Sequence, residues 1–192
     1  MIELGRIKLA GPLVLAPIAG FTDSPFRKIC VSHGCGLTMT ELISAEGIVR
    51  KNKKTMDLLK FTEEERPFAI QIFGRKPETM AAAAEVVETL SPDIIDINMG
   101  CSVSDVLSRC RGSALINDKI LSNEIIQAVK ENSKGIPVSV KTRIGFDKIQ
   151  TEDWIGFLLE KDLDLLTVHG RLSKENYSTP CRWDEIKRAV SL

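Results

Sequence analysis

Short runs of apolar residues alternate with helical patterns along almost the whole chain, and this alternation restricts the fold more than any other feature. A strand–helix–strand order that repeats in this way predicts a parallel sheet with right-handed crossover connections. Runs of this length, flanked by turn residues, are typical of buried strands. The expected strands cover Leu13–Ala16, Leu37–Thr40, Phe68–Phe73, Ile94–Asn98, Val138–Lys141 and Leu165–His169.

The stretches between these runs show helical spacing of apolar residues. The clearest covers Pro77–Leu90, where proline suits the first turn because its missing N–H group is not needed there. A second helix is expected to begin near Thr151, a good N-cap residue, and a third follows Trp183. The inward face of the first helix is predicted to carry Met80, Ala83, Ala84, Val87 and Leu90.

Two architectures fit this order of elements, an open doubly wound sheet and a (β/α)₈ barrel. No G-x-G-x-x-G motif follows the first strand and no Walker lysine pattern is present, which disfavours a nucleotide-binding open sheet. We therefore expect an α/β fold of the TIM-barrel type. A complete barrel has eight β/α units and about 250 residues, whereas residues 1–192 hold six. We expect one partial barrel domain, whose open sheet edges could lead to self-association.

The order of residues within the strands predicts where a site lies. Side chains alternate between the two faces of a strand, so odd and even positions face opposite sides. On four consecutive strands one face is aliphatic and the other carries a polar residue near the carboxyl end: Gln71, Asn98, Lys141 and His169. Enzymes with barrel folds place their active sites at this end of the strands. We therefore predict that these four side chains converge on one site.

Charge and cysteine usage exclude several classes of protein. Lys plus Arg and Asp plus Glu both total 26, so the net charge is zero and RNA binding would need local basic patches. The five cysteines form no C-x-x-C motif and the two histidines stand far apart, which indicates neither a metal site nor a disulfide framework and favours the reducing cytoplasm. No apolar stretch reaches the roughly 20 residues of a membrane span.

Seven strings, taken in order, resemble motifs of the tRNA-dihydrouridine synthase family. The resemblance extends from about Leu4 to Val190 and implies FMN bound at the mouth of a barrel. It also implies reduction of particular uridines in tRNA to dihydrouridine, with NADPH re-reducing the flavin. The strings are LAPIAGFTDSPFR, TELISAEGI, AIQIFG, DIIDINMGC, GSALI, VKTRIGFD and VHGR.

The same resemblance implies roles for individual residues around the flavin. The segment of Pro17, Ile18 and Ala19 matches the part of the family that passes beneath the flavin ring. A cation near the ring would stabilise the anionic reduced flavin. Arg143 and Arg171 are expected to support the flavin phosphate or RNA, and we place Arg171 with the cofactor and Arg143 with the substrate. The polar partners of the flavin are expected to be Gln71, Lys141 and His169.

Cys101 matches the general acid of the family. Hydride would pass from the flavin to C6 of uracil, and the thiol would protonate C5, a role that suits a group largely protonated at neutral pH. Asn98 matches a residue between flavin and uracil, and Tyr177, the only tyrosine, could stack on a base.

The chain departs from the family pattern close to this cysteine. Ser102 stands where the family usually has proline, and Cys110–Arg111 stands where glycine and alanine are common. A cysteine would be strained at a position that demands a positive φ.

Two other functions stay open. The chain could belong to another FMN barrel that acts on a free pyrimidine. Alternatively it could be a non-catalytic, truncated fragment. After Leu192 no sequence is left to form strands seven and eight, whose loops commonly hold a phosphate, or the family's helical tRNA-binding domain.

Overall fold

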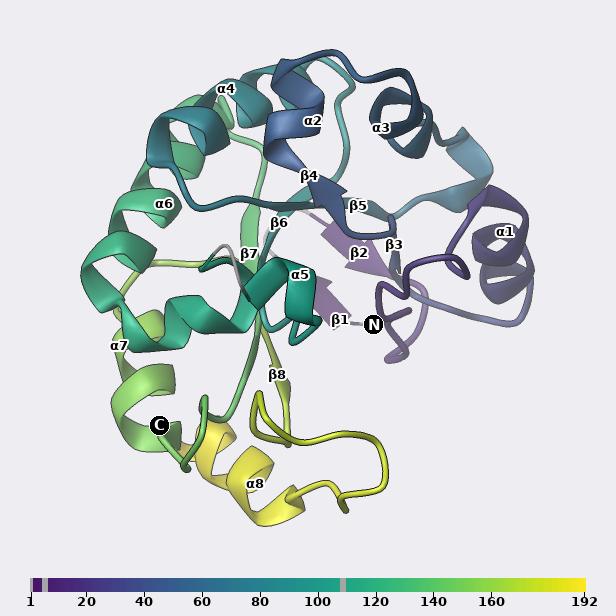
Figure 1. Ribbon diagram of the computed structural model, residues 1–192. Coiled ribbons are helices and arrows are strands. Elements are labelled where there is room, and N and C mark those ends of the chain that lie inside the picture. Colours follow the sequence, from purple (N-terminus) through teal and green to yellow (C-terminus); the bar gives the residue numbers. More distant parts are fainter. Residues whose placement is uncertain (1, 5–6, 108–109) are drawn as a thin grey trace.

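The computed structural model describes residues 2–4, 7–107 and 110–192. A parallel sheet curls around one side of the molecule, and helices form an arc along its convex face (Figure 1). The strands pair in the order β3-β5-β6-β7-β8, and β4 also pairs with β5. This is a partial TIM barrel, so the predicted fold class is confirmed. The parallel strands are β3 (Thr38–Met39), β4 (Ile43–Ser44), β5 (Phe68–Phe73), β6 (Ile94–Met99), β7 (Val138–Arg143) and β8 (Leu165–His169).

The first predicted strand is wrong. Leu13–Ala16 forms only an isolated parallel bridge, between Val14 and Leu37, and no regular strand. Pro12 and Pro17 flank the segment, and proline has no N–H group to extend a ladder. The second predicted strand is shorter than expected, and a separate strand, β4, follows it along the same neighbour, β5.

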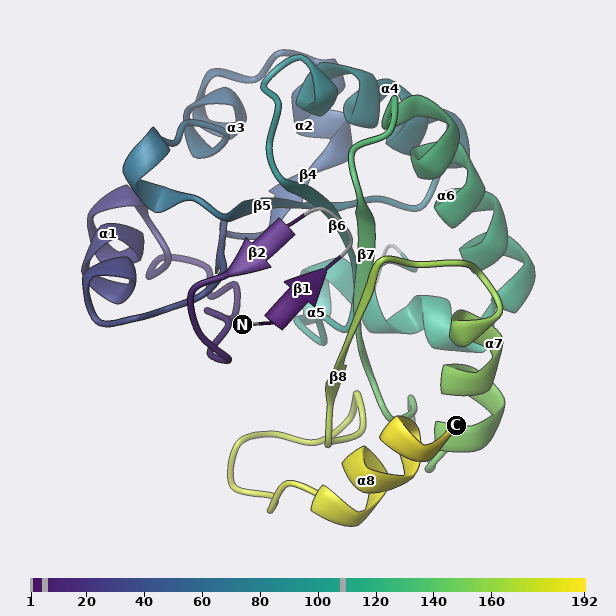
Figure 2. The same ribbon diagram turned by 180° about the vertical axis from the view of Figure 1, so that it is seen from behind.

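A hairpin that the sequence did not predict closes the amino-terminal end of the sheet. Strands β1 (Ile2–Leu4) and β2 (Ile7–Leu9) pair antiparallel on the inner side of the curl (Figure 2). Ile7 and Leu9 pack in one apolar cluster with Leu37, Met39, Ala69 and Ile94. This cluster fills the interior near the start of β5 and β6 and leaves the carboxyl ends of the strands for the site.

The main core lies between the sheet and the helices. As the parity of the strands predicts, the outward residues Ile95 and Ile97 of β6 and Val138 and Val140 of β7 are buried in one apolar cluster with residues of α4 and α6. The helices are α1 (Ser24–Ser32), α2 (Ala45–Val49), α3 (Lys53–Leu58), α4 (Pro77–Glu88), α5 (Ser104–Leu107), α6 (Lys119–Asn132), α7 (Gly156–Leu159) and α8 (Trp183–Ser191). Short 3₁₀ turns cover Glu63–Glu65 and Gly112–Asn117.

Two expected details of the helices are wrong. Helix α4 ends at Glu88, and Leu90 is exposed rather than inward. Thr151 does not cap the helix that follows it. It begins a π-helical turn, Thr151–Ile155, and its hydroxyl donates to Glu185 on α8. Within the described residues, no helix has the length and apolar character needed to cross a membrane.

Candidate functional site

A cleft of about 480 Å³ opens at the carboxyl ends of the strands. Every side chain that the sequence singled out lines it, although these residues come from five separate parts of the chain. The structure therefore brings the predicted set together, while the role of each member stays a prediction. The eleven residues are Pro17, Ile18, Ala19, Gln71, Asn98, Cys101, Lys141, Arg143, His169, Arg171 and Tyr177.

The register of the strands explains why the polar residues meet. Asn98 on β6 lies beside Lys141 on β7, and Arg143 lies beside His169 on β8. One step closer to the hairpin, Gln71 lies beside Asp96. Because these residues have the same parity, they point to the concave side of the curl.

A buried polar cluster lies beneath the cleft, with the fully buried carboxylate of Asp96 at its centre. Oδ2 of Asp96 accepts from Nε2 of Gln71 at 2.6 Å, and Oδ1 accepts from the Ser139 hydroxyl at 2.5 Å. Oε1 of Gln71 accepts from Nδ2 of Asn98 at 2.9 Å. Asp96 has the same parity as Asn98 and therefore lies on the same inner face of β6, but nothing in the sequence by itself assigns it a role.

The segment that carries Cys101 is held from two sides. The backbone N–H of Cys101 donates to Oδ1 of Asn98 at 2.9 Å. Its carbonyl oxygen accepts from both the N–H and the hydroxyl of Ser113, each at 2.9 Å. Gly112 has a φ of 59°, and a Cβ there would lie 2.6 Å from the Cys101 carbonyl oxygen, so only glycine fits.

Arg143 joins the cysteine segment to the loop after β8. Its Nε donates to the carbonyl of Gly100 and its Nη1 to the carbonyl of Leu172, both at 2.8 Å. Its Nη2 donates to the hydroxyl of Ser102 at 3.2 Å, a bond that a proline at this position could not accept. Arg143 therefore uses three of its five N–H groups within the described part of the protein, two on backbone carbonyls and one on the Ser102 hydroxyl, and two remain for a ligand.

The second departure from the family pattern, at Cys110, is visible in the backbone. Cys110 has a φ of 52°, in the left-handed region that favours glycine, so the strain expected from the sequence is present.

The cleft is rich in positive charge. Burial lowers the pKa of Lys141, partly offset by the attraction of Asp96. No described residue accepts a hydrogen bond from the Lys141 ammonium, which lines the cleft. Burial, followed by repulsion from Arg143, Lys141 and Arg171, lowers the pKa of His169 to about 4.

A neutral His169 agrees with its hydrogen bond. Its Nε2 lies 3.0 Å from Nη1 of Arg171, and since arginine can only donate, Nε2 must be the acceptor. The guanidinium of Arg171 also lies 5.6 Å from the ring centre of Tyr177, which is 83% exposed at the mouth of the cleft. The cleft thus has a cationic wall with an exposed aromatic ring at its edge.

The loop between β8 and α8 adds a carboxylate that sequence reasoning missed. Glu175 lines the cleft and forms two bonds of 2.6 Å with Arg182. Hydrogen bonding to Arg182 is the main cause that lowers the pKa of Glu175 to about 2. No sequence motif marks this pair, because both residues lie in an irregular loop. Among the described residues, no group of His, Cys, Asp or Glu side chains is arranged to hold a metal ion.

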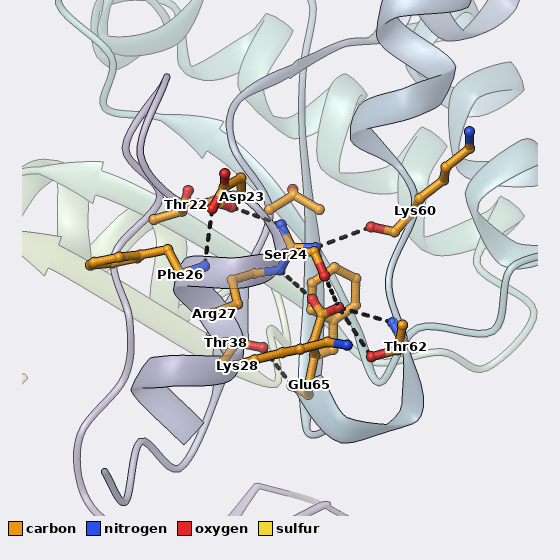
Figure 3. A network of polar contacts seen from close by, with 12 residues as sticks. Thr22, Asp23, Ser24, Phe26, Arg27, Lys28, Thr38, Lys60, Thr62 and Glu65 are labelled. Carbon is orange, nitrogen blue, oxygen red and sulfur yellow. Dashed lines mark hydrogen bonds and ion pairs between the residues drawn. The ribbon is translucent and has the colours of Figure 1, made fainter. Parts of the chain in front are cut away.

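Hydrogen bonds outside the cleft hold the apolar wall that Pro17, Ile18 and Ala19 form. Thr22 bonds through its hydroxyl to both the N–H and the carbonyl of Ile18, at 3.2 Å. The carbonyl of Thr22 accepts from Nη1 of Arg27 at 2.7 Å, and Arg27 pairs with the buried carboxylate of Glu65 (Figure 3). The position of the wall therefore depends on contacts outside the cleft.

Comparisons with known proteins agree with the strings found in the sequence. The family described as dihydrouridine synthase (Dus) matches residues 14–191. A probable tRNA-dihydrouridine synthase of Aquifex aeolicus is 42% identical over 182 residues, which cover 93% of this chain and 57% of that protein. The tRNA-dihydrouridine synthase B of Pseudomonas putida is 34% identical over 196 residues, covering 100% and 58%. The chain thus spans less than two thirds of the length of these relatives.

Proposed function

The chain belongs to the dihydrouridine synthase family, and we propose that it forms the flavin-binding part of an enzyme that reduces specific uridines in tRNA. FMN would be the cofactor, NADPH the reductant, and the cytoplasm the place of action. The observation that carries the proposal is the Lys141 ammonium, which faces the same cleft as the Cys101 thiol and has no acceptor among the described residues.

The residues of the cleft fit a flavin. The volume of the cleft, about 480 Å³, lies within the usual range for small-molecule sites. Pro17, Ile18 and Ala19 offer an apolar surface for a flat ring, while Gln71 and Lys141 offer polar contacts at its edge. The further cations of the cleft, Arg143 and Arg171, suit a ligand that carries a phosphate and gains negative charge on reduction.

The reaction divides between the cofactor and the chain. When bound, FMN would supply the hydride that C6 of a uracil receives. Cys101 would donate its thiol proton to C5, which completes the addition of two hydrogen atoms across the double bond. Lys141 would hold its positive charge beside the electron-rich ring, which is worth most in a site shielded from water.

The substrate class follows from the relatives, whose names state that they act on tRNA. A uridine must leave its stack to reach a group this deep in a cleft. Tyr177 offers an exposed ring at the mouth on which a base could stack, with Arg171 behind it. Conversion of a tRNA transcript but not of free uridine would separate this proposal from an enzyme of free pyrimidines.

Titration of the purified 192-residue chain with FMN, followed by flavin fluorescence, tests the proposal. We expect saturable binding, and binding about tenfold weaker for Lys141→Ala, which corresponds to the loss of one charge-assisted hydrogen bond. Cys101→Ala is the matched control in the same cleft. It should bind FMN like the wild-type chain and form no dihydrouridine in tRNA.

Three results would contradict the proposal or one of the roles in it. A folded chain that shows no saturable FMN binding would refute a flavin site in this cleft. Unchanged binding and unchanged flavin reduction in Lys141→Ala would remove Lys141 from its role, and full turnover by Cys101→Ala would remove the thiol as the acid. Binding without any turnover by the wild-type chain would instead favour a non-catalytic fragment.

A further inference from the structure

A continuous chain of hydrogen bonds links the carboxylate of Asp96 to the backbone of Cys101. It runs from Asp96 through the side chains of Gln71 and Asn98, with donor–acceptor distances of 2.6 and 2.9 Å. It ends at Oδ1 of Asn98, which accepts from the N–H groups of Cys101 at 2.9 Å and Gly100 at 3.2 Å. Asp96 and Gln71 are fully buried and Asn98 is 7% exposed, so water does not compete strongly for these groups.

The direction of every bond in this chain follows from its two ends. A backbone N–H can only donate, so Asn98 must turn its oxygen toward Cys101 and its amide nitrogen toward Gln71. A carboxylate oxygen accepts, so Gln71 must turn its nitrogen toward Asp96 and its oxygen toward Asn98. Both ends impose the same orientation on the two amides. Without the acceptor at position 96, Nε2 of Gln71 would keep, among the described residues, only the weak thioether acceptor Sδ of Met39, at 3.6 Å, to fix this orientation.

We propose that Asp96 is a positioning residue that orients Gln71 and Asn98 and thereby holds the backbone of the Cys101 segment. The importance of this segment for catalysis rests on the proposed function, whereas the positioning does not. One N–H of Asn98 remains after the bond to Gln71, and no described residue accepts it. The same orientation thus leaves Asn98 with a donor for a carbonyl oxygen of a ligand in the cleft.

Charge is the competing explanation for a carboxylate at this position, because Asp96 also attracts the ammonium of Lys141. Two substitutions separate the explanations. In Asp96→Asn the amide oxygen can still accept from Gln71, while its nitrogen donates to the Ser139 hydroxyl, which accepts as readily as it donates. Asp96→Leu removes the acceptor as well as the charge while it keeps the branched shape and the number of side-chain heavy atoms.

Residue-resolved amide hydrogen exchange of the 192-residue chain, measured by NMR, reports the positioning directly. We expect the Cys101 amide to exchange about fivefold faster or more in Asp96→Leu, relative to amides in the centre of β7, as the loss of one hydrogen bond predicts. In Asp96→Asn its exchange should stay within about twofold of the wild type. Ser139→Ala, which removes only the bond to the other carboxylate oxygen, is the matched control and should also leave it unchanged.

Each outcome decides the inference. Equal exchange in Asp96→Leu and the wild type would overturn it, and equally fast exchange in Asp96→Asn and Asp96→Leu would show that charge is what matters. If Asp96→Leu does not fold, Gln71→Met interrupts the same chain one residue later and should release the Cys101 amide equally. Because exchange needs neither flavin nor tRNA, a failure of the proposed function would appear in the FMN titration and leave this result untouched.

Discussion

The buried ion pair of Arg27 and Glu65 gives the sharpest prediction for stability. The Arg27 side chain is 3% exposed and that of Glu65 is 0% exposed. Besides the carboxylate, the guanidinium donates to the carbonyls of Thr22 and Lys60, at 2.7 and 3.0 Å. Figure 3 shows the two side chains facing each other between α1 and the turn that contains Glu65. We consider the substitution Arg27→Met, which keeps most of the apolar volume.

The magnitude follows from what this substitution leaves behind. Glu65 would keep its bonds from the Ser24 hydroxyl and the Thr62 backbone but would lose its only cationic partner among the described residues. Removing one member of a buried pair destabilises a protein by about 3–5 kcal/mol, because the other charge stays buried without compensation. The free energy of unfolding of a typical domain is about 5–15 kcal/mol in total. Arg27→Met should therefore unfold at a much lower urea concentration than the wild type.

The neighbouring residue supplies a matched control. Lys28 pairs with Glu64 and joins the same two elements, but the side chains are 39% and 74% exposed. Exposed pairs of this kind contribute little because water screens them. Urea unfolding followed by the fluorescence of the fully buried Trp154 should show no measurable change in midpoint for Lys28→Met. Equal midpoints for Arg27→Met and Lys28→Met would refute the reasoning. The double variant Arg27→Met/Glu65→Leu should recover stability, since it leaves no unpaired charge.

Two further predictions concern the cleft. The His169 imidazole should titrate near pH 4 by NMR, and a midpoint near 6.5 would contradict the lowered pKa. Because the unfolded chain takes up this proton near pH 6.5, the free energy of unfolding should fall as the pH drops from about 6.5 to 4. Gly112→Ala should lower the midpoint of thermal unfolding more than Gly135→Ala does. Both glycines have a positive φ, but only a Cβ at position 112 would meet the Cys101 carbonyl. Equal decreases in the midpoint would show that backbone strain alone acts.

The sequence determined the fold class and eleven of the side chains that line the cleft, but not Glu175, which lines it as well. Alternation along β6 and β7 has a period of two residues, so parity alone assigns Asn98 and Lys141 to the inner face. The convergence at the carboxyl ends then follows from the parallel order of the strands. The same local reasoning failed at residues 13–16, where the flanking prolines weaken pairing, and at Thr151, whose hydroxyl bonds to α8 instead of capping its own helix.

Only the tertiary structure decided which groups meet inside the cleft. The bond between Gln71 and Asp96 joins residues 25 positions apart, and the contacts of Arg143 with Gly100 and Leu172 span 43 and 29 positions. Such pairs depend on strand register and loop conformation, which no periodicity in the sequence encodes. The low pKa of His169 likewise depends on burial and on three cations supplied by two different elements. Local pattern thus placed the side chains on a face, and packing of distant segments decided their hydrogen bonds and charge.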